Sequence, residues 1–472
     1  MTTGGTSAAK PKFKIAHMER TGVLAFRIAE AAGISRRIRP TLRYPPIEWL
    51  DVGTSWIVCD AERELRERRP VRKIVMSGLL ALVVLAVGGG NAVPTAAAPL
   101  ATLRQGTSAA AFVISGRISC GTPNSCLAIA DNDNQSGQTQ VVMAWNGTAW
   151  RSVAMPRPKP TVARVYLAGV SCKSASACVV VGAYVTLAGR GAERPYALTW
   201  NGRSLSPTAA PPVPKGGGAT SLTGVSCITT TTICIAVGDS QGGVGPLIVE
   251  TWNGAKWTLQ TARIPGGARS TYPGAVSCHF TRFCVVAGES YASLHGAPAM
   301  LLARWNGKGF TVMKAPVPAG AANITLNDIS CPSATFCGVA GFSANSSGKR
   351  DFGFAEMWNG KSWTVAKVAA PNGNAASFLF GISCRPSGFC VAVGSEGPST
   401  AARATALSYN GKKWTAQNVP GPGAGKSSDF FGVNCLRDNQ CTAIGEIVSP
   451  GTATATPLGG LWKGSSWRLV PA

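Results

Sequence analysis

The chain has 472 residues, of which 45% are hydrophobic and 14% are charged, and its formal net charge is +24. This apolar content excludes a wholly disordered chain, and 56 glycines with 31 prolines favour many turns over long helices. Only three histidines are present, which disfavours a zinc enzyme built on imidazole ligands.

The N-terminal region differs from the rest of the chain. Residues 1–70 lack the turn signals that recur later. Basic residues between Arg68 and Lys73 precede an apolar run from Ile74 to Val87, and small residues follow up to Ala98. This order predicts a secretory signal over 71–98. Residues 1–70 are then either an extension from a start codon placed too early or a cytoplasmic tail, in which case the apolar run is a signal anchor.

Residues 99–472 contain a pattern that occurs seven times, with first cysteines 51 to 55 residues apart. The cysteine pairs are Cys120 with Cys126, Cys172 with Cys178, Cys227 with Cys234, Cys278 with Cys284, Cys331 with Cys337, Cys384 with Cys390, and Cys435 with Cys441. After each pair an aromatic residue follows, at Trp145, Trp200, Trp252, Trp305, Trp358, Tyr409 and Trp462. Asn-Gly comes next in six repeats, and a second large apolar residue stands five positions after the first.

Each repeat predicts four short strands. The first ends at the first cysteine, the second begins at the second cysteine, the third ends at the aromatic residue, and the fourth begins near the second aromatic residue. Asn-Gly between two strands is a strong hairpin signal, because both turn residues must accept positive φ. Seven such units predict an all-β, seven-bladed β-propeller. An open solenoid or two smaller bundles are the alternatives. Ring closure stays open, with 100–105 or 109–115 as candidates for an extra closing strand.

The two cysteines of each repeat flank a short turn between adjacent strands. Such strands bring Cβ atoms within disulfide range, and an exported chain meets an oxidising compartment. The sequence therefore predicts one disulfide inside each blade. Zinc is disfavoured because the cysteine spacing is not C-x2-C and no histidines accompany the pairs, so no metal ligands are assigned. Buried free thiols are the remaining alternative.

The hairpin pattern W-N-G-x-x-W resembles the Asp-box hairpin of sialidase-type propellers, S-x-D-x-G-x-x-W. The shared part is a glycine with tryptophan three positions later, as in Gly147 with Trp150 and Gly254 with Trp257, whereas the aspartate is replaced by the first aromatic residue. Over about residues 110–472 the repeats also resemble uncharacterised secreted repeat proteins of high-GC actinobacteria. Both resemblances imply a propeller and say little of function.

The connections of a propeller fall on two faces. The cysteine turns and the Asn-Gly turns lie on one face, which we call the turn face. The remaining connections lie on the opposite face, which we call the variable face because they differ in length and composition. A rigid scaffold with variable loops favours a recognition surface there.

One position after the second strand is acidic in four of the seven repeats. In a closed ring these carboxylates form a partial ring at the channel mouth that can hold Ca²⁺, an amine or sugar hydroxyls. Solvated or Arg-paired carboxylates are the alternative, and no other cofactor is assigned. The candidate ligand-binding residues are Asp131, Asp239, Glu289 and Glu446, with Arg194 and Arg350 from two loop insertions.

From residue 99 onward the chain has 30 basic and 13 acidic residues, which favours anionic partners such as cell-wall polymers or acidic glycans. The charges are dispersed and no nucleic-acid motif occurs, so no nucleic-acid partner is expected. We predict an exported, monomeric binding module, secreted or at the cell surface, that recognises a glycan, a cell-wall polymer or an extracellular protein. It contacts a membrane only through the N-terminal segment, if that segment stays uncleaved.

Two other classes of function remain. The first is a carbohydrate-active enzyme, either a sialidase-like glycoside hydrolase or a lyase, although no catalytic residues are assigned. Such an enzyme needs one or two blades with polar insertions that converge on the channel, together with paired carboxylates. The second is a purely structural envelope protein.

Overall fold

A computed structural model describes residues 112–471 except for 133–138, 159–161, 187–192, 216–217, 241–243, 245–246, 263–267, 294–298, 346–350, 369–376, 399–400 and 450–454. The predicted extension over 1–70 and the predicted signal over 71–98 lie outside the described residues. Within them no helix is long and apolar enough to cross a membrane.

The described residues form seven sheets of four consecutive strands each, which we call blades 1 to 7. Blade 1 contains β1 (Phe112–Thr122), β2 (Ser125–Asn132), β3 (Thr139–Trp145) and β4 (Trp150–Val153). Blade 2 contains β5 (Val162–Ser174), β6 (Ala177–Thr186), β7 (Glu193–Trp200) and β8 (Leu205–Pro207). Blade 3 contains β9 (Thr220–Cys227), β10 (Cys234–Ser240), β11 (Leu247–Trp252) and β12 (Trp257–Ala262). Blade 4 contains β13 (Ser270–Phe280), β14 (Phe283–Tyr291), β15 (Ala299–Trp305) and β16 (Phe310–Val312).

The last three blades follow the same order. Blade 5 contains β17 (Ala321–Ser333), β18 (Phe336–Asn345), β19 (Asp351–Trp358) and β20 (Trp363–Lys367). Blade 6 contains β21 (Ser377–Cys384), β22 (Phe389–Glu396), β23 (Arg403–Asn410) and β24 (Trp414–Gln417). Blade 7 contains β25 (Ser427–Arg437), β26 (Gln440–Val448), β27 (Ala455–Trp462) and β28 (Trp467–Pro471). All pairings are antiparallel.

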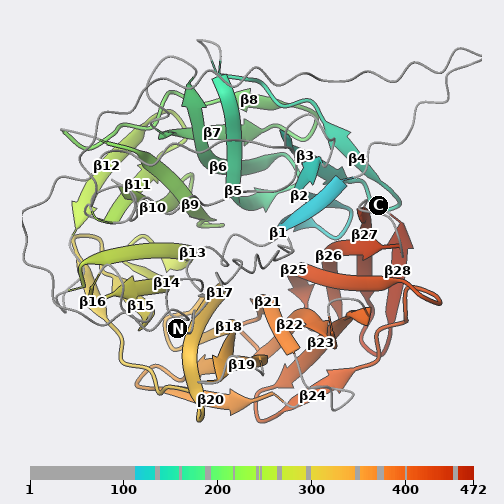
Figure 1. Cartoon of the computed structure of the whole chain (residues 1–472). Coiled ribbons are helices and arrows are strands. Elements are labelled where there is room, and N and C mark those ends of the chain that lie inside the picture. Colours follow the sequence, from blue (N-terminus) through green and yellow to red (C-terminus); the bar gives the residue numbers. More distant parts are fainter. Residues whose placement is uncertain are drawn as a thin grey trace, which may run out of the picture. The chain divides into compact units, whose positions relative to one another are not determined.

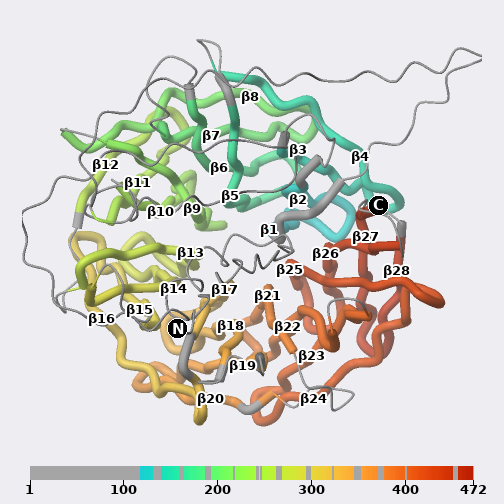
Figure 2. The backbone as a smooth tube through the Cα atoms, in the orientation of Figure 1, coloured from blue at the N-terminus to red at the C-terminus, as the bar shows by residue number. Residues whose placement is uncertain are grey.

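The seven blades form a β-propeller, as the sequence predicts (Figure 1). Ring closure, which the sequence left open, comes from contacts between blade 1 and blade 7. The first strand of every blade is innermost and the fourth lies at the periphery (Figure 2). Each first strand contacts the first strand of the next blade, and β1 contacts β25, β26 and β27 of blade 7. Residues Phe112 to Ser115, considered above as part of a closing strand, belong instead to β1 of blade 1.

The hairpins form because their turn residues suit the required backbone. The glycine of each hairpin has φ between 78° and 100°, where side chains with a Cβ are strained. The preceding residue closes the turn, as where the N–H of Asn146 donates to the carbonyl of Ala149 at 3.2 Å. The side chain of Asn146 also accepts hydrogen bonds from Thr148 N–H and Ala149 N–H. The two aromatic residues face each other across the hairpin, as Trp145 and Trp150 do at 5.5 Å between ring centroids.

All seven predicted disulfides are present, one in each blade. They lie among apolar side chains of the second and third strands, which form the core between blades. In six blades the bonded cysteines are directly opposite each other in the ladder of the first two strands. The bonds join Cys120 to Cys126, Cys172 to Cys178, Cys227 to Cys234, Cys278 to Cys284, Cys331 to Cys337, Cys384 to Cys390, and Cys435 to Cys441.

The strand ends at the disulfides differ from the prediction. In blades 1, 2, 4, 5 and 7 the first strand continues past its cysteine, because the ladder resumes after an irregularity and leaves a tighter turn. The second strand was predicted to begin at the second cysteine, but only β10 does so. In the other blades it begins one residue earlier, because that residue already pairs with a neighbouring strand. The cysteines that therefore stand second in their strands are Cys126, Cys178, Cys284, Cys337, Cys390 and Cys441.

Candidate functional site

The innermost strands surround a polar cavity of about 170 Å³ in the centre of the ring. Every blade lines it with the residues just before its first cysteine. Counting back three positions from that cysteine, five blades have glycine or alanine, and the two exceptions are Arg117 and Asp328. Gly381 leaves no room for a side chain, because a Cβ there would lie 2.9 Å from the Cα of Gly432 in the next blade.

Arg117 and Asp328 meet across this cavity. The Arg117 Nη1 atom donates to Asp328 Oδ1 at 3.2 Å, and Nη2 donates to the carbonyl of Gly274 at 2.6 Å. The Asp328 carboxylate also accepts the backbone N–H groups of Ile329 and Ile382. Burial raises the pKa of Asp328, while Arg117 and the two N–H groups oppose that shift. One ion pair therefore joins blade 1 to blade 5 through the channel, with a further hydrogen bond to blade 4.

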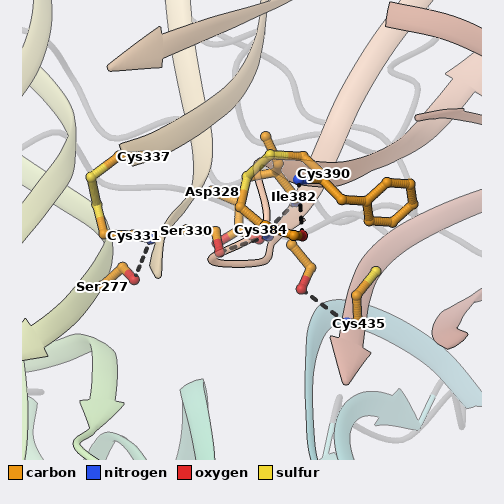
Figure 3. The surroundings of a disulfide bond; sticks show 12 residues. Ser277, Asp328, Ser330, Cys331, Cys337, Ile382, Cys384, Cys390 and Cys435 are labelled. Carbon is orange, nitrogen blue, oxygen red and sulfur yellow. Dashed lines mark hydrogen bonds between the residues drawn. A yellow bond between two sulfur atoms is a disulfide. The ribbon is translucent and has the colours of Figure 1, made fainter. Parts of the chain in front are cut away.

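A hydrogen bond links each of blades 1 to 6 to the next blade at the level of the disulfides (Figure 3). The serine before the first cysteine accepts from the backbone N–H of the next blade's first cysteine, as Ser330 does from Cys384 at 2.9 Å. We call this bond the Ser–Cys latch. It occurs six times, with Ser119, Ser171, Ser226, Ser277, Ser330 and Ser383 as acceptors. Blade 7 has Asn434 instead, whose Oδ1 atom has no hydrogen-bond partner among the described residues.

We call the end of the channel towards the variable face the channel mouth. In every blade the acidic position singled out in the sequence lies opposite a residue of the innermost strand. In blades 2 to 7 that residue stands three positions before the one equivalent to Arg117. In blades 2 to 7 these innermost residues are Tyr166, Ser221, Tyr272, Thr325, Phe378 and Asp429. Three residues of a strand span roughly 10 Å, which places the mouth about that far from the polar cavity.

Two predicted acids of the mouth are held by hydroxyl groups of their own blades. Ser221 Oγ donates to Asp239 Oδ2 at 2.9 Å. The hydroxyl of Tyr291 donates to Glu289 Oε2 at 2.8 Å. Burial and this hydrogen bond raise the pKa of Tyr291, so the phenol stays protonated. Asp239 and Glu289 are thus oriented carboxylates on neighbouring blades.

The remaining predicted site residues are located only by their position in the strands. Glu446 lies directly opposite Asp429 in the blade 7 ladder, and Arg194 lies half-buried opposite Tyr184 in blade 2. Asp131 belongs to β2, but its side chain lies outside the described residues, as does all of Arg350. Among the described side chains no three acidic, cysteine or histidine groups lie together as a metal site, so these side chains alone do not assemble the predicted Ca²⁺ ring.

Sequence reasoning missed the aromatic part of the mouth. Tyr166 and Tyr272 are 36% and 42% exposed, and the guanidinium of Arg164 lies over the ring of Tyr166. In blades 5 and 6 the rings of Phe342, Phe378 and Phe380 contact one another, and the centroids of Phe342 and Phe378 are 5.1 Å apart. Counting six positions back from the first cysteine finds the aromatic residues of blades 2, 4 and 6, but only the ladder shows that they face the acidic positions.

Sequence reasoning also missed two further acids, Glu193 and Asp429. Glu193, at the start of β7 in blade 2, has a pKa raised by burial and then by the charge of Asp239 in blade 3. Asp429 has a pKa raised by burial, which a hydrogen bond from Ser395 of blade 6 opposes. Carboxyl groups from adjacent blades therefore influence one another at this end of the channel.

No protein-family model and no curated protein matches this chain. Solved propellers are similar in fold. The β-propeller domain of the trilobed protease from Pyrococcus furiosus has a TM-score of 0.43 at 7% identity, covering 76% of this chain and 97% of that one. The six-bladed fucose-recognising lectin of Aleuria aurantia has a TM-score of 0.40 at 12% identity, and the match covers 67% of this chain and 100% of that one. The Hadza microbial sialidase has a TM-score of 0.38 at 10% identity, and the match covers 76% of this chain and 66% of that one. Similarity at this level carries no argument about function, so the chain is a β-propeller without a sequence family.

Proposed function

We propose that this chain is an exported binding module whose ligand binds at the channel mouth. The ligand is an extracellular glycan, a cell-wall polymer or a protein. Seven disulfides favour an oxidising, extracellular compartment. The observation that carries the proposal is the pairing, within one ring of positions, of exposed tyrosines with oriented carboxylates. Aromatic faces stack on the apolar faces of sugars, and carboxylates accept hydrogen bonds from their hydroxyl groups.

Blades 2 to 4 provide the strongest part of this surface. Tyr166 and Tyr272 are exposed, with Ser221 and Asp239 on the blade between them. Glu289 lies opposite Tyr272 and is fixed by Tyr291. These groups come from inner strands rather than from flexible loops, so they lose little conformational freedom when a ligand binds.

Residues 99–472, produced with oxidative folding, test the proposal on an array of glycans and wall polymers, with and without Ca²⁺ and across a salt series. The double variant Tyr166→Ala with Tyr272→Ala should weaken binding roughly tenfold or more, because each aromatic contact contributes about 1 kcal/mol. The double variant Asp239→Ala with Glu289→Ala should weaken it as well. Binding that needs Ca²⁺ would assign an ion to the acidic positions.

The matched control is Phe280→Ala, which removes an exposed aromatic side chain from the turn face and should leave glycan binding unchanged. Equal losses in the tyrosine variant and in this control would contradict a site at the mouth. Binding of anionic polymers alone, lost at moderate salt in every variant, would reduce the proposal to net charge.

The enzymatic alternative draws on Glu193 and Asp239. A carboxyl group whose pKa is raised by burial and by a second carboxylate has the character of a general acid. Fluorogenic glycosides test this, because Glu193→Gln should abolish hydrolysis while leaving ligand binding at the mouth intact. A hydrolysis rate equal to that of buffer for the unaltered protein would leave the binding module as the better proposal.

A further inference from the structure

The turn face carries two short turns from every blade. One joins the paired cysteines and the other is the hairpin turn between the paired aromatic positions, which is Asn-Gly in six blades and Lys463-Gly464 in blade 7. The two turns of a blade lie side by side, because the indole N–H of Trp145 donates to the carbonyl of Pro123 at 3.3 Å, and that of Trp200 donates to Ala175 at 3.1 Å. All these turns are described, so the composition of the whole face follows from the sequence.

This face is strongly basic. Between the paired cysteines and between the paired aromatic positions, eleven residues are basic and only Asp438 is acidic. Asp438 accepts a hydrogen bond from the hydroxyl of Ser387 in blade 6 at 2.9 Å. The basic residues are Lys173, Arg203, Lys256, Arg282, Lys308, Lys361, Arg385, Lys412, Lys413, Arg437 and Lys463.

The positive charges of the turn face are accessible and uncompensated. Nine of the eleven residues are exposed, and Lys173 and Arg385 are half-buried. None of them forms an ion pair with a carboxylate of the described residues. Blades 2 to 7 each contribute at least one of them, so the charge extends around most of the ring. Along the sequence these residues are scattered, and only the fold collects them on one side.

The hairpin turns of this face share one geometry. Asn306 N–H donates to the carbonyl of Gly309 at 3.2 Å, and Lys463 N–H donates to Ser466 at the same distance in the last blade. Similar turns arranged around a ring present their tips at one height. A linear polyanion would contact only a few of these tips at a time, whereas a planar anionic surface contacts all of them together.

Among the phenylalanines of these turns, one is strongly exposed. Phe280, in the cysteine turn of blade 4, is 54% exposed, and its ring contacts that of His279 at 3.9 Å between centroids. Arg282 follows two positions later. An exposed ring beside a cation suits the headgroup level of a bilayer, where apolar and charged groups are both accommodated.

From these observations we infer that the turn face docks onto an anionic lipid bilayer, which leaves the variable face directed away from the membrane. The attraction is electrostatic and should fall steeply with salt. This surface is separate from the channel mouth and does not depend on the function proposed for it.

Vesicle sedimentation tests the inference with residues 99–472, which contain all seven blades, all seven disulfides and the closed ring. The vesicles are phosphatidylcholine alone or phosphatidylcholine mixed with phosphatidylglycerol. The turn-face variant carries Lys308→Thr, Lys361→Thr, Lys412→Thr and Lys413→Ala, which copy the uncharged tip Thr148-Ala149 of blade 1. Its affinity for anionic vesicles should fall roughly 100-fold or more, since each basic residue near such a surface contributes about a factor of five. Phe280→Ser should cause a smaller loss.

The matched control removes four exposed cations from the connections between blades, through Arg157→Thr, Lys215→Thr, Lys314→Thr and Lys426→Ala. Retained vesicle binding in this control, with loss in the turn-face variant, supports the inference. Equal losses in both would show that net charge alone is responsible and would overturn it. Absence of vesicle binding also overturns it, including a case in which soluble polyphosphate binds to the same residues. Thermal unfolding of both variants confirms that each remains folded.

Discussion

Glu250 and Glu356 occupy equivalent positions in blades 3 and 5, two residues before the first tryptophan of each hairpin. Both side chains are fully buried, and their carboxyl oxygens have no hydrogen-bond partner among the described residues. Burial raises the pKa of Glu250 to about 8 and that of Glu356 to about 7. Blades 1 and 2 have Met143 and Leu198 at this position, so the repeat places it in apolar surroundings.

These two carboxyl groups should make the stability of the protein depend on pH. In the folded state each stays protonated above the ordinary value of 4.5, so the folded chain binds more protons than the unfolded chain. The free energy of unfolding should therefore fall as pH rises from about 4.5, by at most about 1.4 kcal/mol per pH unit per group, and level off near pH 8. Urea unfolding at several pH values measures this.

The control for this prediction uses residues that other blades already contain. Glu250→Leu and Glu356→Met, which copy Leu198 and Met143, should remove this part of the pH dependence and stabilise the protein most at pH 8. The same slope in the double variant and in the unaltered protein would show that other groups cause the pH dependence.

At the scale of strands, the Ser–Cys latch connects neighbouring blades six times and is interrupted once. The interruption lies between blades 7 and 1, where Asn434 replaces the serine. Asn434→Ser should supply the hydroxyl that the other blades use and raise the free energy of unfolding by about 1 kcal/mol. Chemical denaturation with the disulfides intact measures the difference.

The opposite substitution tests the same bond where it exists. Ser330→Ala leaves the N–H of Cys384 without its acceptor and should lower the free energy of unfolding by about 1–2 kcal/mol. If Asn434→Ser destabilised the protein, the seam would be closed by packing that does not tolerate the smaller side chain.

Strands and turns were predictable because the signals that define them are local. Asn-Gly fixes six of the seven hairpins, and Lys463-Gly464 takes its place in blade 7. The cysteine spacing fixes the first turn, so the blades and disulfides follow from the sequence. The continuation of β1 beyond Cys120 was not predicted, because it depends on an irregular ladder. The acidic positions of the mouth were found by counting along the second strand, whereas Tyr166 and Tyr272 needed the cross-strand register. The ion pair of Arg117 with Asp328 joins residues 211 positions apart, which no local pattern indicates.

At the scale of the whole molecule, seven disulfides each join cysteines six or seven positions apart. In the chain-entropy model one such loop contributes about 2 kcal/mol. The double variant Cys384→Ala with Cys390→Ala should lower the free energy of unfolding by about that amount, measured under non-reducing conditions. Full reduction should lower it much further, and an unchanged unfolding midpoint in the presence of dithiothreitol would contradict a stabilising role.

The distribution of charge also becomes visible only in the complete ring. The sequence shows 30 basic and 13 acidic residues in dispersed order from residue 99 onward. The ring turns this into a basic turn face opposite a mouth that holds Asp239, Glu289, Asp429 and Glu446. The two faces therefore differ in electrostatic character although their blades share one pattern.

Because every sheet of the described residues consists of four consecutive strands, no blade takes a described strand from the other end of the chain. β1 contacts blade 7, so the first and last blades are neighbours. A circular permutant that begins in another connection between blades and joins blade 7 to blade 1 would thus leave every hairpin and every disulfide within one blade. In evolutionary terms, the unit that can be copied, lost or exchanged is one contiguous gene segment of about fifty codons, and the ring places no special demand on which copy comes first.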